Sequence, residues 1–182
     1  FLAGIPGTVG GALAGNAGAW GSSICERLIR AWVVDERGVR TELNRADVEY
    51  AYRRSSLAEH IITEAELALE PRARVEVERQ VQKCRRRKTG AQPTGEPNAG
   101  CIFKNPPGES AGKLLDLCGM KGRQVGGAQV SPRHANFICN IGHASANDVA
   151  DLVRQMREAV RQRFGIELDL ELKHWAARPK VA

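Results

Sequence analysis

Hydrophobic positions in the first part of the chain come in short runs of the length and type that form strands. The run over residues 27–43 is rich in apolar and β-branched residues and is interrupted at Glu36-Arg37-Gly38, which predicts a β-hairpin. The run over residues 61–69 predicts another strand, which Pro71 follows.

Beyond Pro71 the hydrophobic period becomes helical. Val77, Val81 and Cys84 recur three to four residues apart, which predicts a helix from about Val75. A second, longer helix is predicted to begin after Ser145, with Asp148 completing a capping box, and to end at Gly165. Its apolar stripe consists of Val149, Leu152, Val153, Met156, Val160 and Phe164.

Shorter elements are predicted around and between these helices. Residues 110–119 read as a short helix with a serine cap and a glycine stop. Residues 124–130 and 136–141 predict two strands. Residues 166–172 alternate strictly and predict a final strand, with Glu167, Asp169 and Glu171 on one face. Such a face is usually solvated, although one carboxylate can line a site.

The order of these elements predicts an α+β fold. Because the hydrophobic period changes after Pro71, we expect two lobes, over residues 1–71 and 76–175. The length of 182 residues is enough for one domain or two small ones, with a sizeable core.

Composition excludes several classes of protein. With 42% hydrophobic and 26% charged residues the chain is of the globular type, and no apolar run approaches the roughly 20 residues of a membrane span. It shows no signal-peptide pattern. The five cysteines form no Cys-x-x-Cys pair, so neither a disulfide framework nor a metal site is expected, and a cytoplasmic location is favoured.

The net charge of +6 indicates an anionic partner, and much of it is concentrated between Arg72 and Lys88. A basic run of this kind can bind nucleic acid. It is more often the solvated face of an amphipathic helix, and no aromatic residues that could stack on bases are interleaved with it. We therefore expect no nucleic-acid partner, and no obligate protein partner is evident.

The first stretch with candidate chemistry is residues 1–21, which contain seven glycines. Glycines permit positive φ angles, and the exposed N–H groups of such a loop can bind phosphate. The stretch is neither a Walker loop nor a dinucleotide fingerprint. A phosphate-binding loop and a tightly packed buried turn both remain open.

The second stretch is Asn98–Pro106, which places a thiol, an ammonium group and a carboxamide close together at Cys101, Lys104 and Asn105. In an extended conformation Cys101, Phe103 and Asn105 would share one face. Such a face suits a polar substrate. The alternative is a loop-to-strand junction with a buried cysteine and a solvated lysine.

Eight motifs resemble, in their order, those of the UDP-N-acetylenolpyruvoylglucosamine reductase family, and they run nearly from end to end. They are Gly4–Gly11, Asn16–Gly21, Tyr52-Arg53-x-Ser55, Ala99–Pro106, Ala111–Leu115, Gly126–Ser131, His134–Ile138 and Phe164–Glu171.

The resemblance implies a flavoenzyme that uses FAD and NADPH. Such an enzyme reduces the enolpyruvyl ether of a UDP-sugar, giving UDP-N-acetylmuramate for peptidoglycan synthesis. The lobe over residues 1–71 is then part of an FAD-binding domain, and the lobe over residues 76–175 binds substrate. The implied flavin contacts are Gly4, Ile5, Pro6, Gly7, Thr8, Gly10 and Gly11.

The resemblance also assigns candidate catalytic residues. Cys101 stands where the family usually has the serine that protonates the substrate, and Arg53 and Glu171 match the arginine and glutamate that complete the site. The implied substrate contacts are Tyr52, Lys104, Asn105 and His134.

Two departures from the family pattern bear on these expectations. The family's first flavin loop, a Gly-x-Gly-Ser-Asn-type turn, has no counterpart in the chain, which we therefore expect to be an N-terminally truncated fragment. The interval between Arg53 and Cys101 also lacks an inserted loop with a tyrosine. A fragment that binds a nucleotide sugar without catalysis is the alternative function.

Overall fold

The computed structural model describes residues 1–174. The chain divides into two compact units, one over Phe1–Lys88 and the other from Thr89 onward. This division lies within helix α2 (Arg74–Ala91), further along the chain than the expected boundary near Pro71. The expected end of the second lobe, residue 175, lies outside the described residues.

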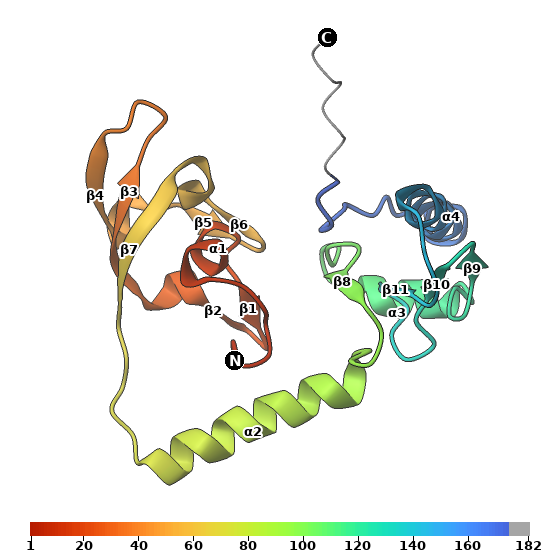
Figure 1. Ribbon diagram of the computed structural model, residues 1–182, viewed down its shortest axis with the longest axis horizontal. Coiled ribbons are helices and arrows are strands. Elements are labelled where there is room, and N and C mark those ends of the chain that lie inside the picture. Colours follow the sequence, from red (N-terminus) through yellow and green to blue (C-terminus); the bar gives the residue numbers. More distant parts are fainter. Residues whose placement is uncertain (175–182) are drawn as a thin grey trace. The chain divides into compact units, whose positions relative to one another are not determined.

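The first unit is built on a three-stranded antiparallel sheet of order β4-β3-β7 (Figure 1). Strands β3 (Leu28–Val34) and β4 (Arg40–Asn44) form the predicted hairpin, and β7 (Ile61–Leu67) is the predicted third strand. Asp35 closes the hairpin turn, because its carboxylate accepts hydrogen bonds from the N–H groups of Arg37 and Val39. Both predictions are confirmed.

One face of this sheet is buried and the other carries charge. The core of the unit consists of Leu13, Ile24, Cys25, Leu28, Ala31, Val33, Val48 and Leu57. On the outer face the guanidinium of Arg30 pairs with Glu66 at 2.5 Å and with Glu42 at 3.2 Å. Because these pairs are exposed, they contribute little to stability, and burial of the inner face holds the sheet together.

Two small hairpins of similar design flank the sheet. The first comprises β1 (Gly18–Ala19), β2 (Ser22–Ser23) and the 3₁₀ turn η1 (Ile24–Arg27). The second comprises β5 (Tyr50–Ala51), β6 (Arg54–Ser55) and η3 (Ser56–Glu59), and a further 3₁₀ turn, η2 (Arg45–Asp47), precedes it. Each hairpin is closed by an equivalent backbone hydrogen bond, from Ile24 to Ala17 and from Ser56 to Glu49.

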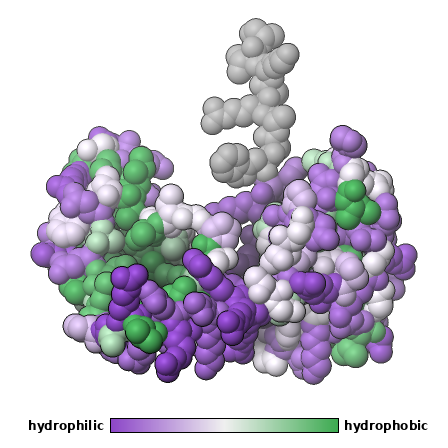
Figure 2. Space-filling view, turned by 60° about the horizontal axis from the view of Figure 1, so that its bottom comes forward, coloured by the Kyte–Doolittle hydropathy of each residue, from purple (hydrophilic) through white to green (hydrophobic). Residues whose placement is uncertain are grey.

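Helix α2 confirms the helical period that begins near Val75. No residue of α2 is buried, and its surface is mostly hydrophilic in the space-filling view (Figure 2). Val77 is 45% exposed, and Val81 and Cys84 are half-buried. Except for half-buried Lys88, the basic residues of this run therefore lie on a solvated helix.

The second unit is built on a four-stranded antiparallel sheet of order β8-β11-β10-β9. Its strands are β8 (Asn98–Cys101), β9 (Gln124–Val125), β10 (Ala128–Val130) and β11 (Phe137–Asn140). Helices α3 (Ala111–Leu117) and α4 (Ala146–Phe164) supply the other side of the core. Among its largest buried side chains are Phe103, Leu115, Met120, Leu152, Met156 and Leu168.

The predicted helix ends of this unit are confirmed by their hydrogen bonds. The hydroxyl of Ser110 accepts a hydrogen bond from the N–H of Lys113 at the start of α3. Ser145 and Asp148 form a reciprocal capping box at the start of α4. Gly165 ends α4 with a φ of +67°, a left-handed conformation that favours glycine.

One predicted strand is instead a hairpin. Residues 124–130 form β9 and β10, which turn at Gly126 and Gly127. Gly126 has a φ of +52°, and a Cβ on Gly127 would lie 2.0 Å from the carbonyl oxygen of Gly142. The prediction of a single strand was wrong because both glycines are needed for a turn packed against the 142–144 loop.

The predicted strand over residues 166–172 is also wrong as a regular strand. This segment makes a single bridge, between Leu170 and Phe103, together with a few backbone hydrogen bonds to residues 102–104. Its neighbour follows the end of β8 and is too short to form a ladder. Glu167 and Asp169 are exposed, whereas Glu171 is half-buried. The α+β fold class itself is confirmed.

Candidate functional residues of the two units

The candidate proton donor lies at the last position of strand β8. Cys101 is half-buried and pairs with Phe137 of β11. The regular strand ends at Cys101, and the two residues that follow it, Ile102 and Phe103, are both only 1% exposed. The expected sharing of one face by Cys101, Phe103 and Asn105 stays a prediction.

The side chain of Asn105 stabilises the loop that leads into helix α3. Its carboxamide oxygen accepts a hydrogen bond from the N–H of Ala111 at 3.1 Å. The side chain of Asn105 therefore helps to fix the path of the loop. Lys104 is half-buried beside it, and its N–H donates to the carbonyl oxygen of Asp169 at 2.8 Å.

Glu171 lies on a segment that runs directly beside the Cys101 stretch. The N–H of Glu171 donates to the carbonyl oxygen of Ile102 at 2.9 Å, and the N–H of Leu172 donates to the same oxygen at 3.2 Å. The structure thus brings the backbones that carry Cys101 and Glu171 together within the second unit.

His134 is half-buried and held in one orientation. Its Nδ1 accepts a hydrogen bond from the N–H of Asn136 at 3.2 Å, and its ring meets the ring of Phe137 at a centroid distance of 4.9 Å. Burial, and then the charge of Lys121, lowers the pKa of His134. The imidazole is therefore neutral near pH 7, and its acceptor role at Nδ1 leaves the proton on Nε2.

Asn136 organises this region, although the sequence analysis assigned it no role. It is 2% exposed, and its carboxamide accepts from the N–H of Phe103 at 2.9 Å and donates to the carbonyl of Phe103 at 2.8 Å. A single amide inside the apolar run His134–Ile138 is the signal that points to it, since a buried amide must find partners.

Arg53 lies at the tip of the small β5–β6 hairpin in the first unit. Its φ is +55°, which is unfavourable for a residue with a side chain, and its guanidinium donates to the carbonyl of Gly18 at 3.2 Å. The guanidinium also lies 5.0 Å from the ring centroid of Tyr52. Exposed Tyr52 and half-buried Arg53 thus form one corner of this unit.

A buried asparagine holds this corner in place. The carboxamide of Asn16 donates to the carbonyl of Ala51 at 2.9 Å and accepts from the N–H of Cys25 at 3.2 Å. It thereby ties the β5–β6 hairpin to the first hairpin motif, and Asn16 is only 4% exposed. Arg53 belongs to the first unit and Cys101 and Glu171 to the second, so their convergence stays a prediction.

The glycine-rich stretch combines an exposed loop with a short helix, α1 (Val9–Ala14), which the sequence analysis did not predict. Thr8 caps α1, because its hydroxyl accepts from the N–H of Gly11 at 3.0 Å. Gly4 and Gly7 have φ angles of +79° and +137°. The loop that precedes the helix is exposed from Gly4 through Thr8.

Two cations lie close to Trp20 of the glycine-rich stretch within the first unit, and Lys88 also approaches Gly4. The guanidinium of Arg87 lies 4.8 Å from the ring centroid of Trp20, and the ammonium of Lys88 lies 5.8 Å from it. A Cβ on Gly4 would lie 3.5 Å from the aliphatic chain of Lys88. Burial lowers the pKa of Lys88. An exposed glycine-rich backbone beside cationic side chains is a suitable environment for an anionic group.

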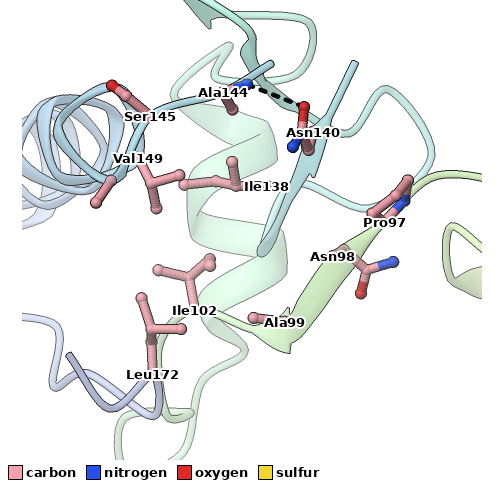
Figure 3. Close-up of a pocket in the computed structure, with 11 residues that line it drawn as sticks. Pro97, Asn98, Ala99, Ile102, Ile138, Asn140, Ala144, Ser145, Val149 and Leu172 are labelled. Atoms are coloured by element: carbon pink, nitrogen blue, oxygen red, sulfur yellow. Dashed lines mark hydrogen bonds between the residues drawn. The ribbon is translucent and has the colours of Figure 1, made fainter. Parts of the chain in front are cut away.

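Two pockets of about 370 Å³ each open on opposite faces of strand β11. The first is mostly apolar and is lined by Pro97, Asn98, Ala99, Ile102, Ile138, Asn140, Ala144, Ser145, Ala146, Val149 and Leu172 (Figure 3). The second is more polar and is lined by Pro93, Thr94, Gly95, Glu96, Gln129, Ser131, Pro132, Arg133, Cys139 and Ile141. Cys101 lines neither pocket.

Two further features concern residues 1–174, the part of the chain that the structure describes. Within them, no three or more histidine, cysteine, aspartate or glutamate side chains are placed to bind a metal ion together. None of the helices described there combines the length and the apolar character of a membrane span.

The α+β fold is similar to that of a known family of reductases. The family model for the C-terminal domain of UDP-N-acetylenolpyruvoylglucosamine reductase matches residues 92–175. The crystal structure of UDP-N-acetylenolpyruvylglucosamine reductase from Thermus caldophilus is similar with a TM-score of 0.84 and 39% identity, over 96% of this chain and 63% of that one.

Two curated relatives extend the comparison. UDP-N-acetylenolpyruvoylglucosamine reductase of Bacillus licheniformis is 42% identical over 176 residues, which cover 95% of this chain and 96% of that protein. UDP-N-acetylenolpyruvoylglucosamine reductase 2 of Symbiobacterium thermophilum is 41% identical over 98% of this chain, but only 59% of its own length is covered. The chain belongs to the UDP-N-acetylenolpyruvoylglucosamine reductase family, and it spans about three fifths of the length of several curated relatives, the Symbiobacterium thermophilum protein among them.

Proposed function

We propose that the protein carries out the NADPH-dependent, FAD-mediated reduction of UDP-N-acetylenolpyruvoylglucosamine to UDP-N-acetylmuramate, a cytoplasmic step of peptidoglycan precursor synthesis. The observation that carries this proposal is membership of the reductase family, supported by 42% identity to a relative that the chain covers almost completely. The side-by-side course of the Cys101 and Glu171 segments also supports it.

The first unit is suited to hold the flavin. The exposed loop from Gly4, with Lys88 nearby, fits the diphosphate of FAD, because backbone N–H groups and a cation together stabilise phosphate. Within this loop, Gly4, Ile5, Pro6, Gly7, Thr8, Gly10 and Gly11 would make the flavin contacts. Bound FAD supplies hydride chemistry, with NADPH as the reductant, that no protein side chain provides.

The protein's own residues supply proton transfer and charge stabilisation. As hydride adds to one vinyl carbon, negative charge develops toward the substrate carboxylate, and the guanidinium of Arg53 stabilises it. The thiol of Cys101 donates a proton to the other vinyl carbon, which balances the reduction. Glu171 orients this proton donor or shares a proton with the intermediate.

Substrate binding is assigned to polar side chains around these three residues. Lys104 supplies a positive charge for the phosphates or carboxylate of the UDP-sugar, and Asn105, His134 and Tyr52 supply hydrogen bonds. Because burial keeps His134 neutral with its proton on Nε2, it can donate one hydrogen bond without adding charge.

The proposal is tested with the complete gene product. We expect the purified protein to show flavin absorbance, to oxidise NADPH, and to form UDP-N-acetylmuramate when the enolpyruvyl substrate is added. A protein that binds the UDP-sugar but has neither flavin nor turnover would establish the non-catalytic alternative instead.

A further inference from the structure

Asn136, the residue directly before strand β11, makes hydrogen bonds through both its backbone and its side chain. Its own carbonyl accepts from the N–H of Ile102 at 2.9 Å, and its N–H donates to His134. Its carboxamide binds both backbone groups of Phe103. Both backbone polar groups of this buried residue, and both the oxygen and the nitrogen of its carboxamide, therefore have a hydrogen-bond partner.

These hydrogen bonds continue the β8–β11 ladder after the regular strand ends. The ladder pairs Cys101 with Phe137, and the carboxamide of Asn136 then takes the place of a backbone pair for Phe103. On the other edge, the Glu171 N–H binds Ile102 and the Lys104 N–H binds Asp169. Residues 102–104 are thus held from both sides.

We propose that Asn136 is a positioning residue, which fixes Cys101, Lys104 and His134 in the geometry that the reduction of the substrate requires. This inference rests on the proposed function. The hydrogen bonds of Asn136 go to the backbone of Ile102 and Phe103 and to the ring of His134. It acts by holding the short backbone segment between Cys101 and Lys104, and by donating its N–H to the ring of His134.

An amide is the side chain that meets this requirement, because it presents one acceptor and one donor in the same plane. A leucine has a similar size but offers neither group. An ionised carboxylate keeps the acceptor and loses the donor, and it would place a negative charge against the carbonyl of Phe103. A protonated carboxyl group restores the donor.

The test therefore uses Asn136→Leu and Asn136→Asp in the complete protein, with Asn140→Asp as the matched control. Asn140 lies at the end of the same strand and is exposed, and its carboxamide oxygen accepts from Gly142 and Ala144. A carboxylate keeps both of these bonds, so the control should behave like the parent protein.

Rapid mixing separates the two half-reactions. We expect Asn136→Leu to slow reoxidation of the reduced flavin by the substrate about tenfold to a hundredfold, while flavin reduction by NADPH stays within about twofold of the parent rate. Asn136→Asp should show the same defect at pH 8 and recover toward pH 5, because burial favours the protonated carboxyl group. The control should show no such pH dependence.

Amide hydrogen exchange gives a readout that needs no activity. The Phe103 N–H should exchange at least about tenfold faster in Asn136→Leu than in the control. Unchanged exchange overturns the proposal, and so does faster exchange with normal reoxidation, which would make Asn136 merely structural. A parent protein without either half-reaction would refute the proposed function, and the positioning role with it, whereas the exchange result would still report on the hydrogen bonds.

Discussion

The N–H of Glu171 donates a hydrogen bond to the carbonyl oxygen of Ile102 at 2.9 Å. This bond joins two segments that are far apart in the sequence, and it places Glu171 beside the strand that ends in Cys101. A thiol and a carboxyl group on neighbouring segments are a suitable basis for controlled proton donation. The following predictions test this arrangement and the fold that supports it.

The role of Cys101 is tested by Cys101→Ala and Cys101→Ser. The alanine variant should lose reduction of the enolpyruvyl group by about 10²–10⁴-fold, because a general acid contributes that much. NADPH oxidation by the flavin should remain nearly intact, since that step needs no proton from Cys101. The serine variant should keep substantial activity, because its hydroxyl occupies the same place.

Stopped-flow absorbance distinguishes the two half-reactions, and Cys118→Ala is the control. Cys118 is another partly buried thiol of the same unit, where it donates a weak hydrogen bond to the carbonyl of Ala159. If Cys101→Ala reduced substrate at the parent rate, Cys101 would be a packed thiol without a catalytic role.

The packing of the β9–β10 turn is tested by Gly127→Ala. Its Cβ would lie 2.0 Å from the carbonyl oxygen of Gly142, so backbone must shift, and we expect a loss of about 1–3 kcal/mol or more in the free energy of unfolding. Gly142→Ala is the control, because a Cβ there meets nothing within 4 Å. Urea unfolding of both variants measures the difference, and equal stabilities would show that the turn is not tightly packed.

The capping box of α4 predicts that the stability of the fold falls at acidic pH. Hydrogen bonding from the N–H of Ser145 lowers the pKa of Asp148 below its ordinary value of 3.8. A lowered folded-state pKa stabilises the fold above the unfolded value, and this contribution is lost as the pH falls from about 3.8 through the folded pKa. Asp148→Asn should flatten this part of the unfolding profile, and a profile as steep as that of the parent would exclude the linkage.

Buried His134 predicts a second dependence of stability on pH, in a higher pH range than that of Asp148. Burial places its folded pKa below the ordinary value of 6.5, so its contribution to stability is present above pH 6.5 and is lost as the pH falls through the folded value. Protonation also removes the acceptor for the N–H of Asn136. NMR titration of the ring should find the lowered pKa, and a value above 6.5 would contradict it.

Much of the fold could be predicted from the sequence, because several elements carry complete local signals. Helix α4 has a capping box at Ser145, an apolar stripe and a glycine stop, and it forms as predicted. The β3–β4 hairpin likewise follows from two β-branched runs around Gly38. In these elements local preference and burial favour the same structure.

The predictions that were wrong concern segments whose structure depends on tertiary contacts. The Gly126-Gly127 turn depends on the 142–144 loop, and the 166–172 segment alternates in sequence but finds only a short neighbour. Helix α1 was missed because its glycines are poor helix formers, and burial of Leu13 stabilises it.

The candidate site could be found only in part, and for a physical reason. The resemblance supplied Arg53, Cys101 and Glu171, but no periodicity indicates that Glu171 binds the Ile102 backbone. Asn136 and Asn16 were missed because a buried amide is recognised by its partners, which lie far along the chain. The convergence of Arg53 with Cys101 and Glu171 depends on how the two units pack together, which no local sequence pattern encodes.

The proposed reduction is tested most directly by adding UDP-N-acetylenolpyruvoylglucosamine to the NADPH-reduced complete protein and following the flavin absorbance. We predict that the flavin is reoxidised and that one equivalent of UDP-N-acetylmuramate forms. A protein that purifies without flavin, or a reduced flavin that the substrate leaves unchanged, would contradict the account.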